Sequence, residues 1–249
     1  MSKRFGIFIT WLVVLLSAIA CGQQTDATEP WETLFNGKDF TGWKIIGSKG
    51  KAWVEDEAFV CHQVCNTPEH TFICTENKYS DFILEAEAKI EGPLHTGFLL
   101  RCVDANEDNA KVAIYGYQVK IDPTERRWTG GVFDDFGKSW NWFYPLKESE
   151  KARSAFTLNE WNRFRMEAIG DSIKVWVNDI PTCNLVHNKY RKGTIAIKIH
   201  SMGNKPEMEK VLMRYRNIRI ITENPEKYRK AMDYPVIDLI KQKTPQEDK

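Results

Sequence analysis

The sequence has almost no excess charge of either sign. Its 249 residues include 35 lysines and arginines against 34 aspartates and glutamates, which leaves a formal net charge of +1. This balance gives no electrostatic basis for binding nucleic acid or an anionic membrane surface, so we expect neither as a partner. The chain also has no internal repeat.

Long hydrophobic runs are also missing. The apolar run at residues 5–20 is shorter than the roughly 20 residues that a membrane-spanning helix needs. Lys3 and Arg4 precede this run and small residues follow it, which is the pattern of a secretory signal peptide. We therefore expect residues 1–20 to be a signal peptide that is removed on export.

The residues around Cys21 indicate a lipid anchor. The small residues directly before Cys21 are similar to a bacterial lipobox, although Ala18 stands where leucine is usual. We expect Cys21 to be lipidated and residues 21–30 to be a polar tether. The protein would then be exported to the bacterial cell envelope and anchored in the periplasm or on the outer surface. A plain secreted protein and an uncleaved anchor are the alternatives.

Apart from Cys21 the chain has few cysteines, and their number is odd. Five remain, so they cannot all pair within one chain: Cys61, Cys65, Cys74, Cys102 and Cys183. Cys61 and Cys74 each follow a short apolar run, which predicts that they act as small buried hydrophobic residues in strands. A zinc site and a Cys61–Cys74 or Cys65–Cys74 disulfide remain as alternatives.

Short strands with turns between them account for most of the chain. Apolar and polar residues alternate, or apolar runs occur, in the segments 52–61, 81–90, 96–104, 113–122, 163–170, 172–179, 193–200 and 210–221. No helical runs separate these segments, which predicts an all-β sandwich or jelly roll in a single domain over residues 31–222. After it we expect a polar C-terminal tail, 223–249, with a short helix at 225–233 and disorder over 241–249.

The order of the strand motifs resembles a known family. The motifs are "LFNGKDFTGW" (34–43), "YSDFILEAEAKI" (79–90), "TGFLLR" (96–101), "GYQVKID" (116–122), "TGGVFD" (129–134), "NEWNRFRMEAIGDSIKVWVND" (159–179), "GTIAIKIH" (193–200) and "RYRNIRI" (214–220). Together they are similar to the 3-keto-disaccharide hydrolase domain, formerly a domain of unknown function. The resemblance implies a concanavalin-like jelly roll of two antiparallel sheets with one concave face. It also implies an exported enzyme that acts on glycosides with a ketone at C3.

The sequence departs from the family pattern on the strands expected to carry the site. Gln118 stands where the family usually has glutamate, and Lys120 and Lys198 stand where it usually has glutamine. One acidic group is therefore lost and two amines are gained. These departures favour the alternative of a non-catalytic carbohydrate-binding lipoprotein on the same fold. A structural envelope lipoprotein that binds no sugar is the third class.

Alternation predicts which side chains share a face, because successive side chains of a strand point to opposite sides. If these strands belong to the concave sheet, one groove is lined by Glu87, Arg101, Gln118, Lys120, Lys198 and His200. The simpler alternative for each residue is an ordinary solvated strand face. An ordinary wet face is rich in threonine, serine, lysine and glutamate, whereas a strand that ends in histidine beside strands with arginine and glutamate suits a sugar groove better.

The chemistry of a 3-keto sugar assigns roles to these residues. A ketone at C3 acidifies the C2 proton, and a base that removes it leaves an enediolate, after which the bond at C1 breaks and water adds back. Such a reaction needs a base and cations near the developing oxyanion. We expect His200 or Glu87 to be the base, and Arg101 with Lys198 or Lys120 to stabilise the enediolate.

No organic cofactor is needed for this route, but a divalent cation remains possible. It would take over the stabilisation of the enediolate. Glu87, Asp122 and His200 are the ligands that such a cation would use, although their spacing is not diagnostic and we assign no metal site. A direct double-displacement glycosidase is less favoured, because the strand with Glu85 and Glu87 lacks the aspartate of such enzymes.

Further residues are expected to bind the sugar. Gln118, Lys120 and Asp122 share the polar face of one predicted strand. In the aromatic segment 126–144, Trp140 and Trp142 alternate, so only one can face the groove, and we favour Trp140 as a stacking surface. Asp134 beside them is expected to bond to sugar hydroxyls. The sequence thus predicts a carbohydrate substrate cleaved as a 3-keto-glycoside.

Overall fold

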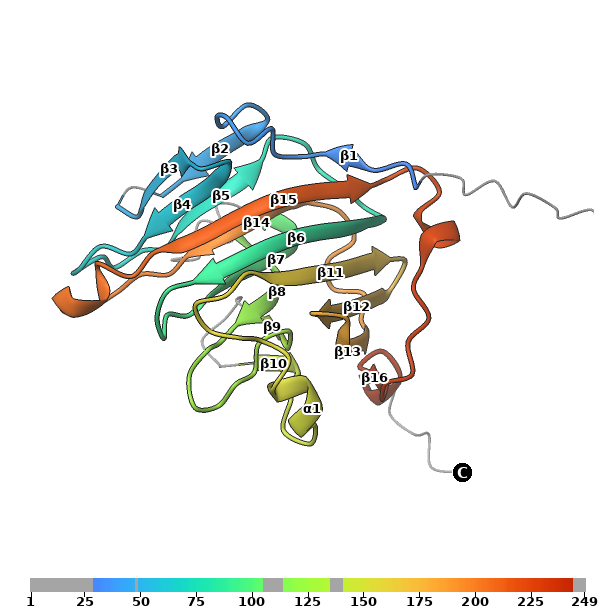
Figure 1. The fold of residues 1–249 in the computed structure, drawn as a ribbon. Helices are drawn as coiled ribbons and strands as arrows, with labels where there is room; N and C mark the ends of the chain where they lie inside the picture. Colours follow the sequence, from blue (N-terminus) through green and yellow to red (C-terminus); the bar gives the residue numbers. More distant parts are fainter. Residues whose placement is uncertain (1–28, 48, 105–113, 135–140, 244–249) are drawn as a thin grey trace, which may run out of the picture.

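The computed structural model describes residues 29–47, 49–104, 114–134 and 141–243. Its strands form two sheets that enclose the core between them (Figure 1). The first sheet, sheet A, contains β16 (Ile237–Asp238), β13 (Ile180–Val186), β12 (Ser172–Val177), β11 (Asn162–Ile169), β6 (Phe82–Ile90), β15 (Met213–Ile221), β4 (Ala58–His62) and β3 (Lys51–Glu55) in spatial order, and β1 (Glu32–Thr33) also pairs with β15.

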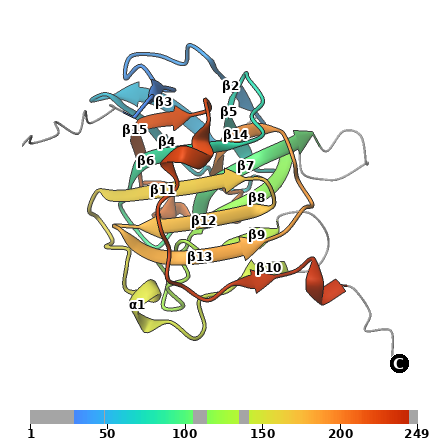
Figure 2. The same ribbon diagram turned by 90° about the vertical axis from the view of Figure 1, so that its right-hand side faces the viewer.

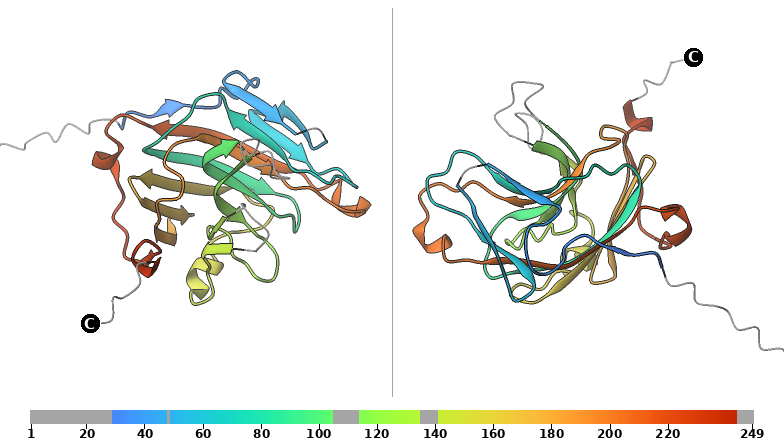
Figure 3. Two further views of the ribbon diagram at one scale, coloured as in Figure 1. Left: turned by 180° about the vertical axis from the view of Figure 1, so that it is seen from behind. Right: turned by 90° about the horizontal axis from the view of Figure 1, so that it is seen from above.

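Sheet B contains the remaining strands. In spatial order they are β10 (Asn141–Tyr144), β9 (Val132–Asp134), β8 (Ile114–Ile121), β7 (Thr96–Asp104), β14 (Thr194–Ile199), β5 (Thr71–Thr75) and β2 (Trp43–Ile46). All neighbours are antiparallel except β13 and β16. The predicted all-β jelly-roll sandwich of two antiparallel sheets is therefore confirmed, and Figure 3 shows its two layers from behind and from above.

The helices are short and lie outside the sheets. The one α-helix among the described residues, α1 (Glu150–Arg153), begins after Ser149, whose hydroxyl accepts a hydrogen bond from the amide of Ala152. Three 3-10 turns complete the secondary structure of the described residues: η2 (Pro206–Met208), η3 (Pro225–Tyr228) and η4 (Lys241–Lys243). The short helix predicted at 225–233 is present only as the 3-10 turn η3, which ends at Tyr228.

Alternation along the strands places the core as predicted. On β6, Phe82, Leu84 and Ala86 are buried between the sheets, while Glu85 and Glu87 are partly exposed on the outer face. Sheet B differs, because its central strands are buried on both faces. A second apolar cluster lies on its outer face and consists of Phe72, Cys74, Leu99, Cys102, Ile114 and Ala196. The outer face of sheet B is therefore not an ordinary solvated face.

The C-terminal segment packs along sheet A instead of extending away as a tail. In Figure 2 it descends across β11, β12 and β13 before it pairs with β13 as β16. Lys230 donates its amide hydrogen to Glu167, and Asn184 donates to the carbonyl of Tyr234. Tyr144 of β10 donates to the carbonyl of Pro235. Residues 223–243 are therefore integrated into the sandwich, and the expected disorder over 241–249 does not hold for 241–243.

The structure shows no disulfide among the five cysteines that follow Cys21. Cys61, Cys74, Cys102 and Cys183 are buried, and burial raises the pKa of the Cys74 thiol to about 12. Neither alternative disulfide forms. The prediction that Cys61 and Cys74 act as small hydrophobic residues is confirmed by their places in the two apolar clusters.

Candidate active site on the outer face of sheet B

Strand register brings three histidines and an aspartate into one row. Thr71 of β5 pairs with Ile199 of β14, which pairs with Thr96 of β7, which pairs with Ile121 of β8. These four residues are buried on one face, so the adjacent residues point to the opposite one. The adjacent residues are, in the same order, His70, His200, His95 and Asp122.

A second row with two lysines lies directly beside the first. Lys198 pairs with Gly97, and Gly97 pairs with Lys120 on its other side. Because neighbouring strands lie about 4.8 Å apart, the two lysine backbones are separated by roughly 10 Å across the glycine. The side chains of Lys198 and Lys120 are 0% and 4% exposed. We call the two rows together with Gln118 the histidine–lysine face.

Aromatic side chains border this face on the side of β9 and β10. Gln118 pairs with Phe133, and Phe133 pairs with Trp142, so all three point the same way. The Trp142 ring meets Phe133 and Trp128 edge to face, at centroid distances of 5.3 and 4.8 Å. The guanidinium of Arg126 lies over both tryptophans. The face therefore offers an aromatic wall beside a polar floor, a combination that suits a sugar ring.

Hydrogen bonds fix the tautomers of two histidines. His200 Nδ1 lies 2.7 Å from the carbonyl oxygen of Ser201, which can only accept, so Nδ1 carries the proton and Nε2 the lone pair. The amide of Ser201 donates to His70 Nδ1 at 2.8 Å, so His70 carries its proton on Nε2. The two rings lie 4.3 Å apart. His200 is therefore held as a proton acceptor.

The electrostatics of the face keep His200 neutral. Burial is the main cause, and the nearby charge of Lys198 adds to it, so that the pKa of His200 is lowered to about 2. Burial and the charge of Lys120 likewise lower the pKa of His95, against the opposing effect of Asp122. A negative charge that develops between the lysines would reverse this effect and make His200 a stronger base.

Asp122 is part of a network at the edge of the face. Its carboxylate lies 3.3 Å from His95 Nδ1 and 2.6 Å from the Arg126 guanidinium, and Thr124 donates a third contact. Burial tends to raise the pKa of Asp122, but the hydrogen bonds from Thr124 and Arg126 prevail and lower it. Asp122 is thus an ionised group that holds the Arg126 guanidinium and lies close to His95.

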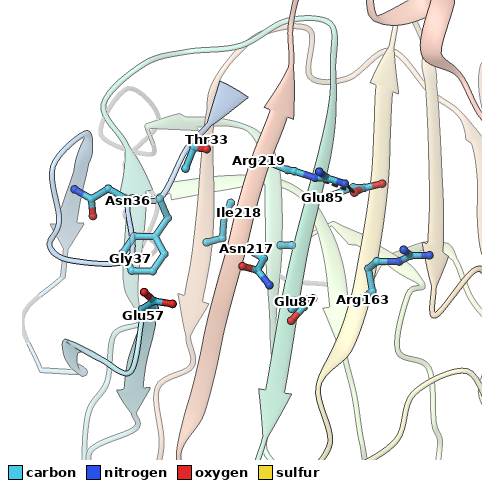
Figure 4. Close-up of a pocket in the computed structure, with 12 residues that line it drawn as sticks. Thr33, Asn36, Gly37, Glu57, Glu85, Glu87, Arg163, Asn217, Ile218 and Arg219 are labelled. Carbon is cyan, nitrogen blue, oxygen red and sulfur yellow. Dashed lines mark hydrogen bonds and ion pairs between the residues drawn. The ribbon is translucent and has the colours of Figure 1, made fainter. Parts of the chain in front are cut away.

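Glu87 does not lie near His200, so the prediction that it lines the same groove is wrong. Glu87 belongs to β6 of sheet A, and it points away from the core on the opposite side of the molecule. There it accepts a hydrogen bond from Arg216 at 2.8 Å. Figure 4 shows it with Glu57, Asn217 and Arg163 around a separate surface pocket of about 490 Å³. Alternation assigns a face but not a sheet, which explains the error.

Arg101 is also not on the histidine–lysine face. A β-bulge between Leu100 and Val103 shifts the register of β7, and Arg101 itself has a φ of 54°. Its side chain is 1% exposed and points into the protein, where it donates to the carbonyls of Ser80, Gly170 and Tyr190 and to Asp81. Arg101 therefore ties three connecting segments together.

Asp134 does not lie where the sequence predicts it, and Trp140 is not among the described residues. Asp134 pairs with Tyr117 and so faces the core, where it accepts hydrogen bonds from Tyr190 and Lys189. This places it away from the face that carries Gln118. Trp140, like Cys21 and the predicted signal peptide, lies outside the described residues. Trp142 is the described tryptophan that borders the face.

Sequence reasoning missed His70 and His95. Both directly precede a strand, with the same parity as Phe72 on β5 and Gly97 on β7, so extending the alternation by one residue would have found them. In the described part of the chain no three His, Cys, Asp or Glu side chains converge as a metal-binding group. The set Glu87, Asp122 and His200, named above for a cation, is divided between the two sheets.

Among the residues described, no helix has the length and apolar character needed to cross a membrane. No curated protein matches the chain.

Solved structures share the fold at low sequence identity. A glycosyl hydrolase-like protein from Parabacteroides distasonis matches with a TM-score of 0.55 and 18% identity, over 78% of this chain and 94% of that one. A galectin-like protein of unknown function from Bacillus subtilis matches with a TM-score of 0.54 and 12% identity, over 77% and 94%. A glycosidic hydrolase matches with a TM-score of 0.52 and 10% identity, over 78% and 95%. At these identities the likeness shows the fold alone.

A family model carries the assignment further. The model for the 3-keto-alpha-glucoside-1,2-lyase-like domain matches residues 30–221, which is most of the chain and nearly all of the described sandwich. The match agrees with the resemblance carried by the strand motifs, and it supports a carbohydrate-related function. The chain belongs to the family of 3-keto-alpha-glucoside-1,2-lyase-like domains.

Proposed function

We propose that this protein cleaves the glycosidic bond of 3-keto-glycosides by elimination followed by hydration, and that the histidine–lysine face carries the reaction. The observation that supports this most directly is the placement of His200. Its proton-accepting Nε2 is set by the bond to Ser201, and its strand neighbour two residues earlier is Lys198. A base next to a buried cation is what abstraction of a proton beside a ketone requires.

Each step of this reaction uses a residue of the histidine–lysine face. His200 Nε2 takes the proton from C2, and the electron pair of that C–H bond moves to form an enediolate with its charge on the C3 oxygen. Lys198 and Lys120 stabilise this oxyanion. The enediolate then collapses, and the bond between C1 and the aglycone oxygen breaks. This oxygen takes the proton from the His200 imidazolium, and the sugar is left as a 3-ketone with a double bond between C1 and C2. Water adds across this double bond, so the net result is hydrolysis.

The low pKa of His200 is compatible with this role only if the substrate changes it. In the empty site a base with a pKa of about 2 would accept a proton poorly near neutral pH. The enediolate brings a negative charge between the lysines, which offsets the repulsion that Lys198 exerts on the imidazolium. The pKa of His200 would thus rise as the transition state forms, while His200 stays unprotonated in the free protein.

The test follows the C2 proton. We expect exchange of this proton with deuterium oxide, observed by NMR on a 3-keto-glucoside, and slower cleavage of the C2-deuterated compound. His200→Gln should abolish both exchange and cleavage, whereas Glu87→Gln, on the opposite side of the molecule, should retain them. Cleavage without any C2 exchange or isotope effect in the wild type would contradict an elimination.

A carbohydrate-binding protein without catalysis is the second candidate. Gln118, Lys120 and Lys198 replace the glutamate and glutamines usual in the family pattern, and the weak basicity of His200 in the empty site points the same way. Saturable binding of unmodified glycans, with no turnover of the keto forms, would establish this candidate. Addition of EDTA to the same assays tests whether a divalent cation takes part.

We propose further that Cys21 carries a lipid that anchors the protein in the cell envelope. The support is the signal-peptide pattern that ends at this residue. Mass spectrometry of the protein expressed in bacteria should show a lipid-modified N-terminal cysteine, and Cys21→Ser should release the protein from the membrane fraction. An unmodified cysteine in the mature protein would refute the anchor.

A further inference from the structure

Gln118 leaves one polar atom without a hydrogen bond in the middle of the histidine–lysine face. The side chain is 0% exposed, and its Nε2 donates to the carbonyl oxygen of Thr96 at 3.3 Å. Its Oε1 is buried and has no hydrogen-bond partner among the described residues. Folded proteins seldom leave a buried amide oxygen without a donor, so this atom requires an explanation.

The position of the amide is set by Gly97. A Cβ atom on Gly97 would lie 3.1 Å from Gln118 Nε2 and 3.3 Å from its Cγ, so the side chain of Gln118 lies against the space that the glycine leaves. Lys198 and Lys120 are the two register partners of Gly97. The Gln118 amide therefore lies against β7, the strand that separates the two strands that carry the lysines.

The orientation of the amide is also set. The carbonyl of Thr96 can only accept a hydrogen bond, so the nitrogen end of Gln118 must face it. Oε1 then faces elsewhere, and it can itself only accept. A ligand group next to Oε1 must therefore donate a hydrogen bond, which a hydroxyl does and a ketone does not.

We propose that Gln118 is a specificity-determining residue that accepts a hydrogen bond from one hydroxyl of the bound sugar. This rests on the function proposed above for the same face. The lysines donate only, so they favour a ketone or enediolate oxygen, while Gln118 accepts only and favours a hydroxyl. The two kinds of group side by side orient the sugar so that its ketone lies at the lysines and a hydroxyl lies at Gln118.

The test measures binding and does not depend on turnover. Dissociation constants are determined by calorimetry for methyl glucoside, its 3-keto form and the complete monodeoxy and monodeoxyfluoro series, with wild type and Gln118→Met. In the wild type, loss of one particular hydroxyl should weaken binding about tenfold, because it leaves Oε1 unpaired again. Fluorine at that position should weaken binding as much as hydrogen, since fluorine cannot donate.

The variant assigns the effect to Gln118. In Gln118→Met the discrimination at that one position should disappear while the other positions keep theirs. Asn184→Leu is the matched control, because Asn184 is a similarly buried amide on sheet A that donates to Tyr234, and it should discriminate as the wild type does. Thermal unfolding of both variants shows that each is folded.

Three results would overturn the proposal. They are equal discrimination in Gln118→Met and wild type, full tolerance of fluorine at every position, and no binding of any probe. If Gln118→Met does not fold, the fluorine series on the wild type still decides whether the protein accepts a hydrogen bond from a sugar hydroxyl. Cleavage of the keto forms is assayed separately, so binding with the predicted discrimination but without cleavage refutes the proposed reaction and leaves the role of Gln118 standing.

Discussion

Replacement of Arg101 by methionine should destabilise the protein strongly without a direct effect on the chemistry. The guanidinium is 1% exposed and donates to Ser80 at 2.6 Å, Gly170 at 2.9 Å, Tyr190 at 3.3 Å and Asp81 at 3.0 Å. Methionine retains much of the apolar volume but leaves the three carbonyl oxygens without this donor. The variant therefore isolates the hydrogen bonds from the packing of the side chain.

The magnitude follows from these contacts. Hydrogen bonds to a charged group contribute about 1.5–3 kcal/mol each, and the loss is less than additive because water reaches some of the exposed carbonyls. Asp81 is half exposed and contributes little. We expect the free energy of unfolding to fall by about 4 kcal/mol, which for a domain of this size lowers the melting temperature by roughly 8–16 °C.

Urea denaturation followed by tryptophan fluorescence measures this loss. Arg163→Met is the control, because Arg163 and its partner Asp179 are 50% and 58% exposed, and such a pair contributes at most about 1 kcal/mol. A loss below about 1 kcal/mol for Arg101→Met would refute the structural role. A variant with wild-type stability but no turnover would instead return Arg101 to the catalytic residues.

The remaining predictions concern the two faces of the sandwich. Because the pKa of His200 is lowered from 6.5 to about 2, the unfolded chain binds a proton that the folded one does not, and stability falls as the pH drops below 6.5. Between pH 6.5 and pH 5 the wild type should lose about 2 kcal/mol more than His200→Gln, as measured by urea denaturation; an equal loss would contradict the assigned burial. Lys198→Met should lower kcat about 100- to 1,000-fold and raise the pKa of His200 in an NMR titration, and an unchanged kcat would remove Lys198 from the mechanism. Glu87→Gln should leave kcat unchanged, since the residue lies on sheet A, and a large fall in kcat would contradict that placement.

The sequence predicts the strands well because alternation is a local property. The strands and their buried faces on β6, β8 and β14 follow from a period of two residues, and each is observed. The two-sheet arrangement depended on the order of the family motifs, since local patterns do not specify which strands pair. Local patterning therefore accounts for the elements but not for their neighbours.

The candidate site could be predicted only in part, for the same reason. The alternation correctly predicts that one face carries Gln118, Lys120, Lys198 and His200, because β8 and β14 both pair with β7. Glu87 has the right alternation on a strand of the other sheet, which no local pattern reveals.

Arg101 was misplaced by a bulge, and His70 was overlooked because it stands one residue before its strand. The bulge inserts an extra residue and reverses the parity that the alternation argument relies on. Its signal, a positive φ at an arginine, is visible only in the folded backbone.

If the histidine–lysine face carries the proposed reaction, it cleaves 3-keto-glycosides and leaves their unoxidised parents intact. The most direct test incubates the purified protein, residues 22–249, with a 3-keto-β-glucoside, 3-keto-trehalose and the parent sugars, with and without EDTA, and measures release of the aglycone. We expect release from the keto forms alone, and we expect His200→Gln to abolish it. Release from the parent sugars at a similar rate, or undiminished release by His200→Gln, would contradict the proposed reaction.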